Sequence, residues 1–110
     1  MNHFDVITTK EEREQAGLKQ YKFVEAAGTI TAVLNFRAWG KNMNLGCFFR
    51  TEAGDKFCVY LWRSKLNPDV YGPRSESINF AEVKNKTKWN LSFEKTRSGK
   101  IFLADAKELG

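Results

Sequence analysis

The sequence predicts a mainly β protein, a small antiparallel barrel of five or six strands with a short N-terminal helix. Residues 45–63 and 88–106 each read as a hairpin, because two aromatic and β-branched runs flank a short polar turn. Residues 21–36 form a third such run, and Gly28 inside it indicates a bulge or a tight bend. In the second hairpin Trp89 alternates with two further apolar residues, so we expect it in the core.

We expect one β-barrel domain over residues 21–110, preceded by a helical arm over residues 1–20. The chain of 110 residues is close to the commonest domain size, and its 42% hydrophobic and 28% charged residues are typical of a folded protein. Thr8 or Thr9 can cap a short helix whose first turn carries glutamates. Because this helix has almost no apolar stripe, it is either an exposed lead-in or an arm that docks on a partner.

The remaining segments are predicted to connect the strands. Residues 37–44 read as a loop. Residues 64–77 read as a long irregular connection, because Pro68 and Pro73 each interrupt a strand or a helix. Residues 78–83 could form a strand or a short helix, which leaves the strand count at five or six.

The composition disfavours several classes of function. No apolar run approaches the roughly 18 to 20 residues of a membrane-spanning helix, and the first residues do not resemble a secretion signal, so we expect a cytoplasmic protein without membrane association. Cys47 and Cys58 are too few for a disulfide scaffold or a zinc site, and we expect both to be reduced. With His3 as the single histidine and scattered acids, we expect no enzyme activity, no metal and no cofactor.

The net charge of +5 lies in the β-rich part of the chain. Residues 1–20 carry four acids and three bases, whereas the remainder carries fifteen bases and nine acids. The segment 84–100 is especially basic, with Glu94 as its single acid. Such a surface favours polyanions, although this amount of positive charge is also ordinary for a soluble protein.

Pairing within the first hairpin predicts an aromatic strip. We expect Thr51 opposite Lys56, which places Phe49, Tyr60 and Trp62 on one face of the two strands. The other face is also apolar, although a small antiparallel sheet normally buries only one face. Either the strip is exposed for binding, or a barrel wall or the N-terminal arm covers it.

Cations accompany these rings and also a tryptophan in the preceding loop. Arg50 and Arg63 flank the strip, and Arg37 and Lys41 lie on either side of Trp39. An exposed tryptophan in a loop indicates a binding role, although it could instead plug one end of a barrel. Rings interleaved with cations are what sequence-tolerant binding of single-stranded nucleic acid requires, since every base can stack and every phosphate carries charge.

The order of elements resembles OB-fold proteins of the single-stranded DNA-binding kind, over about residues 21–107. A long strand bent at glycine, an aromatic and basic loop, an aromatic hairpin, an irregular connection and a final hairpin with a basic tip follow one another. The family usually has a helix between strands three and four, which residues 64–77 cannot supply. The resemblance implies that the loops after strand one and between strands four and five, with the faces of strands two and three, hold the nucleic acid. Carried over by position, these binding residues would be Arg37, Trp39, Lys41, Phe49, Tyr60, Trp62, Arg97 and Lys100.

The sequence therefore predicts a non-catalytic protein that binds single-stranded nucleic acid, with DNA favoured, through these residues together with Arg50 and Arg63. The alternative is a protein-interaction module, such as a phage-type inhibitor or an accessory subunit. Tryptophan, tyrosine, phenylalanine and arginine are enriched at protein interfaces too. Dependence on salt separates the two hypotheses, because phosphate binding weakens steeply with ionic strength.

Overall fold

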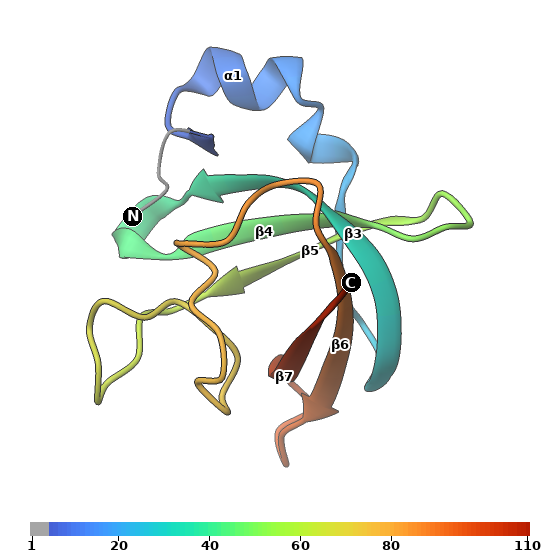
Figure 1. Ribbon diagram of the computed structural model, residues 1–110, viewed down its shortest axis with the longest axis vertical. Coiled ribbons are helices and arrows are strands. Elements are labelled where there is room, and N and C mark those ends of the chain that lie inside the picture. Colours follow the sequence, from blue (N-terminus) through green and yellow to red (C-terminus); the bar gives the residue numbers. More distant parts are fainter. Residues whose placement is uncertain (1–4) are drawn as a thin grey trace.

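The computed structural model describes residues 5–110 and confirms a mainly β fold (Figure 1). Seven strands form one sheet in the order β2-β5-β4-β3-β6-β7, and β1 pairs with β3 outside this path. The elements are β1 (Val6–Ile7), α1 (Lys10–Gln15), the 3-10 helix η1 (Leu18–Gln20), β2 (Lys22–Phe23), β3 (Gly28–Trp39), the 3-10 helix η2 (Lys41–Met43), β4 (Leu45–Arg50), β5 (Lys56–Leu61), β6 (Lys88–Lys95) and β7 (Ile101–Leu109).

Strand β3 is the long central strand of the sheet. Its first half pairs with β6 and its second half with β4, while β1 takes the place beside Arg37 and Ala38 that β6 leaves open. The predicted strand over 21–36 is wrong in its bounds, because Gly28 has a φ of 140° and starts the strand instead of bending it. The irregularity in the ladder falls later, between Leu34 and Phe36.

The predicted closed, wholly antiparallel barrel is not confirmed. The pairs β1–β3 and β2–β5 are parallel, and over residues 5–110 the edge strands β2 and β7 do not pair, so the sheet is open. Backbone amides from the connection lie beside β7 instead: Arg74 and Ser75 donate N–H groups to the carbonyls of Leu103 and Ala104, both at 3.0 Å. Seven strands replace five or six because the sequence gives no periodic signal for the two-residue strands β1 and β2.

The connections match the sequence prediction in part. Residues 64–77 are irregular, as expected. Residues 78–83 form neither a strand nor an α-helix, so no helix lies between β5 and β6. The predicted loop over 37–44 is shorter than expected, because β3 continues to Trp39. None of the helices in residues 5–110 is long and apolar enough to span a membrane.

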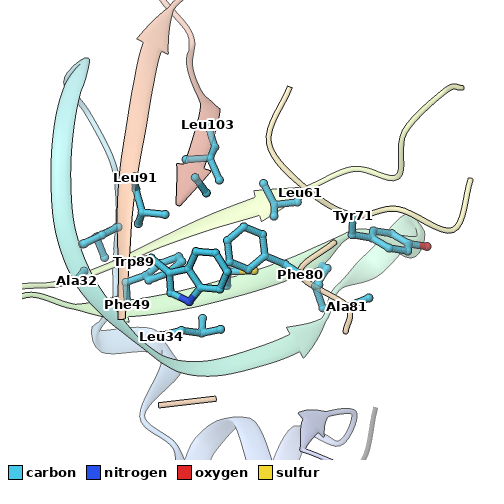
Figure 2. Packing of buried hydrophobic residues seen from close by; sticks show 14 of the residues in the cluster. Ala32, Leu34, Phe49, Leu61, Tyr71, Phe80, Ala81, Trp89, Leu91 and Leu103 are labelled. Atoms are coloured by element: carbon cyan, nitrogen blue, oxygen red, sulfur yellow. The ribbon is translucent and has the colours of Figure 1, made fainter. Parts of the chain in front are cut away.

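The main core lies against the concave side of the sheet (Figure 2). Trp89 is fully buried, as predicted, with its ring 4.8 Å from that of Phe80 and its Nε1 donating to Thr87 Oγ1 at 2.8 Å. Phe49 stacks on Phe57 at 5.3 Å and meets Phe80 edge-on at 6.2 Å. The irregular segment before β6 therefore supplies a central core residue, Phe80.

The N-terminal arm packs on the opposite side of β4 and β5. Its helix has the predicted cap, because Thr9 Oγ1 accepts from the Glu12 backbone N–H and the Glu12 carboxylate accepts from the Thr9 N–H. Helix α1 itself buries no residue. The residues around the helix form a second cluster with the sheet, which contains Ile7, Leu18, Tyr21, Ala38, Phe48 and Cys58.

Arg37 joins three parts of the chain from a fully buried position. Its guanidinium donates to the carbonyls of Phe80 (2.9 Å) and Ala81 (3.1 Å) and to Asn85 Oδ1 (3.1 Å), and it forms an ion pair with Asp5. Burial lowers the pKa of Arg37, and the Asp5 carboxylate opposes that shift. The predicted loop position of Arg37 is wrong, because the residue lies within β3 and its side chain serves the fold.

We predict that Arg37→Met destabilises the protein by about 3 to 5 kcal/mol, because the buried carbonyls of Phe80 and Ala81 lose their donor and the partly exposed Asp5 carboxylate loses its ion pair. Urea unfolding measures this loss. Arg97→Met, which alters an exposed arginine, serves as the control and is expected to leave stability nearly unchanged. Equal stability of the two variants would contradict the role of Arg37.

Cys47 and Cys58 are both free and buried. Cys47 lies in the main core, and Cys58 lies under the arm on the other face of the hairpin. Burial raises the pKa of both thiols, that of Cys58 to about 11. At neutral pH both are therefore uncharged and poorly nucleophilic.

We predict that both cysteines react slowly with a thiol reagent at pH 7 and rapidly after unfolding. The raised pKa of Cys58 also means that stability falls as pH rises above the ordinary thiol value of about 8.5 towards 11, because the unfolded chain releases the proton first. Thiol labelling in native buffer and in denaturant tests the first part. Labelling at the same rate in both solutions would show that the thiols are accessible.

Candidate functional site

The β4–β5 pairing differs by one residue from the predicted register. Phe49 lies opposite Phe57 and Arg50 opposite Lys56, since Thr51 belongs to the turn and accepts the Gly54 N–H at its carbonyl (2.9 Å). The predicted exposure of Phe49 is therefore wrong, and this ring is fully buried. A shift of one residue moves a side chain to the opposite face.

Beside Tyr60 of β5 lies a hollow of about 730 Å³ between β2, the end of β3 and η2, which we call the aromatic groove. Four of the predicted binding residues line it: Trp39 at the end of β3, Lys41 in η2, Tyr60 in β5 and Trp62 just beyond β5. Two exposed rings lie among its lining residues, Phe23 at 66% and Trp62 at 61% exposure. The complete lining is Arg13, Phe23, Trp39, Gly40, Lys41, Asn42, Asn44, Tyr60 and Trp62.

Tyr60 forms the floor of the aromatic groove. Its hydroxyl accepts a hydrogen bond from Arg13 Nη2 at 2.9 Å. Its ring lies 6.0 Å from the Phe23 ring and 5.9 Å, edge-on, from the Phe48 ring. Gly46 allows this position, because a Cβ there would lie 2.9 Å from ring atoms of both Phe48 and Tyr60.

Arg13 and Phe23 reach the groove from the N-terminal part of the chain, and sequence reasoning missed both. Arg13 is held by Tyr60 and by the carbonyl of Trp39, at 3.3 Å from Nη1. Phe23 is placed by the parallel pairing of β2 with β5, opposite Cys58. Neither contact leaves a local pattern, because each joins residues far apart in sequence.

The rim of the groove is a short turn in an uncommon backbone conformation. Asn42 and Met43 both have a φ of 60°, in the left-handed region that most residues avoid. Such conformations concentrate at binding sites, where the surrounding structure holds them. Lys41 is exposed on this rim, and Asn44 Oδ1 is buried with no hydrogen-bond partner among the described residues.

Trp39 lies at the end of β3, paired with Leu45, and not in the loop we predicted. It is half-buried, and its ring meets that of Tyr71 edge-on at 5.2 Å. One part of the ring therefore supports the connection after β5 while the residue also lines the groove. Trp39 therefore contributes to the fold, and its binding role stays a prediction.

The remaining predicted site residues lie outside the groove. Arg63 is exposed beyond Trp62, in a neighbouring hollow. Arg50 is exposed at the far end of β4. Arg97 and Lys100 are exposed on the β6–β7 turn, which Figure 1 shows at the opposite end of the molecule from α1.

The groove combines positive charge with aromatic surface. Arg13 and Lys41 are the charged residues among its described lining, and no carboxylate belongs to that set. In residues 5–110 there is no group of three histidine, cysteine, aspartate or glutamate side chains that could hold a metal ion. This lining suits a ligand that is planar, apolar on its faces and negatively charged.

Comparisons with protein-family models, with curated proteins and with solved structures give no match. The chemistry of the groove therefore carries the functional argument.

We predict that Gly46→Ala destabilises the protein by about 1 to 3 kcal/mol, because the added methyl group displaces the Tyr60 and Phe48 rings. Urea unfolding and the near-ultraviolet circular dichroism of the aromatic rings measure the change. Lys107→Ala, at an exposed position on β7, is the control. An unaltered spectrum would mean that Tyr60 does not rest on this glycine.

Proposed function

We propose that this protein binds single-stranded nucleic acid, with DNA favoured, by stacking bases in the aromatic groove, and that it has no catalytic activity. The observation that carries the proposal is the pair of exposed rings, Phe23 and Trp62, on a groove whose charged lining is Arg13 and Lys41. Each stacked base contributes about 1 to 3 kcal/mol, so two rings give useful affinity when phosphate contacts add to them.

The groove favours unpaired bases over a duplex. Its rings line an open hollow, and a base can stack on them only when it leaves its own stack. The volume of about 730 Å³ is within the range of about 300 to 1,000 Å³ typical of small-ligand sites. A base with its sugar therefore fits, with its phosphate beside Arg13 or Lys41.

We further propose that the strands have an OB-fold-like arrangement and that the protein is located in the reducing environment of the cytoplasm. A long strand β3, the β4–β5 hairpin, an irregular connection and the β6–β7 hairpin follow in the order of that family. The groove lies beside Tyr60 of β5, the strand that would correspond to the third strand of the family, and the family binds nucleic acid on its second and third strands. The open sheet and the lack of a helix between β5 and β6 depart from the family pattern.

A protein-interaction module is the second candidate function. Met43 beside the groove and Leu66 in the following connection are 61% and 89% exposed. Exposed aliphatic side chains suit a protein partner better than a nucleic acid. A protein that uses this face would bind with little dependence on salt, which distinguishes it from a phosphate-binding site.

We predict that the protein binds a labelled poly-dT oligonucleotide more tightly than a duplex of equal length at about physiological salt. Trp62→Ala and Phe23→Ala should each weaken binding by about 5- to 150-fold, which corresponds to the loss of one stacked base. Leu66→Ala removes an exposed apolar side chain outside the groove and should leave affinity unchanged. Fluorescence anisotropy measures all three.

Lys41→Ala should weaken binding modestly and reduce the slope of log K against log salt by about one, the contribution of one phosphate contact. Lys107→Ala is its matched control.

Trp39→Ala is a weaker probe of binding. The substitution also removes the ring contact with Tyr71, so it should lower the stability of the fold as well as the affinity. Equal or tighter duplex binding, or affinity without salt dependence, would overturn the proposed function.

A further inference from the structure

A second hollow, of about 570 Å³, lies beyond Trp62 from the aromatic groove. Tyr60 and Trp62 line both hollows, so the two adjoin at these rings. The second hollow extends from the end of β5 along the irregular connection to β7. Its described lining includes three cations and a further aromatic ring: Arg63, Lys65, Arg74 and Phe102.

The chemistry of the second hollow repeats that of the first. Arg63, Lys65 and Arg74 are all exposed. The Arg74 Cζ lies over the Phe102 ring, 3.8 Å from its centre, which is a cation–π contact. Glu76 is the carboxylate in the lining, and it accepts a hydrogen bond from the Ser64 hydroxyl. Three cations against one carboxylate give the hollow a net positive charge.

Backbone contacts order the walls of the second hollow. Arg63 bridges to Tyr71, and the Ser64 N–H donates to the Val70 carbonyl at 2.8 Å. The Arg74 N–H donates to Leu103 on β7 at 3.0 Å. The segments that carry the cations are therefore anchored at both ends, and binding need not order them first.

We propose that the second hollow is a further nucleotide subsite, so that one strand runs from the aromatic groove over Trp62 towards Arg74 and Phe102. This inference rests on the proposed function. In the OB-fold proteins that the order of elements resembles, single-strand sites cover about 4 to 16 nucleotides, and the aromatic groove accounts only for the short end of that range. The Trp62 ring stacks with one base at the junction, and Arg63 and Lys65 neutralise the phosphates that follow.

The test compares labelled dT oligonucleotides of about 4 and about 12 nucleotides, lengths that span the range of such sites. We expect the double variant Lys65→Gln, Arg74→Gln to weaken binding of the longer strand by about tenfold or more and to reduce its salt slope by about two. Binding of the shorter strand should change little, because the aromatic groove holds it. Phe23→Ala should weaken binding of both lengths.

Lys95→Gln together with Lys107→Gln is the matched control, because it removes the same charge from exposed positions that line neither hollow. The subsite is overturned if this control and the double variant affect the longer strand equally, or if the native protein binds both lengths equally. In either case an effect of Phe23→Ala leaves the proposed function standing. If the native protein binds neither strand, the proposed function fails and the subsite fails with it.

Discussion

The pairing of β4 with β5 decides which side chains this protein buries and which it presents. With Phe49 opposite Phe57, the two rings stack in the core and Phe80 closes over them. Alternation along β5 then places Tyr60 on the other face. A shift of one residue would place Phe49 and Tyr60 on the same face, so the separation of the buried Phe49 from the groove residue Tyr60 depends on this register.

Elements outside the main sheet path complete both faces of that hairpin. On the core side, Arg37 ties β3 to the segment around Phe80 and to Asp5 in the arm. On the other side, the arm covers part of the hairpin and contributes Arg13, whose guanidinium bonds to Tyr60 at the floor of the groove. The contacts that hold the arm in place therefore also position a cation of the site.

Trp62 joins the two binding surfaces that we propose. It lies just beyond the end of β5, with 61% of its surface exposed and a hollow on either side. The surrounding cations come from the arm, from η2 and from the connection between β5 and β6, so no single segment supplies the positive charge. A strand of nucleic acid can follow such a surface because its charge and its rings repeat along its length.

The sequence by itself determined the features that depend on local patterns: the two hairpins, a helix capped by Thr8 or Thr9, the burial of Trp89 and the irregular run over 64–77. It also identified four residues of the groove, Trp39, Lys41, Tyr60 and Trp62, because aromatic rings next to cations in the sequence indicate a binding surface. Only the tertiary structure decided that Arg37 is buried and that the sheet is open. It alone also brought Phe23 to the groove, since that position depends on a parallel pair of strands far apart in the chain, which no local periodicity records.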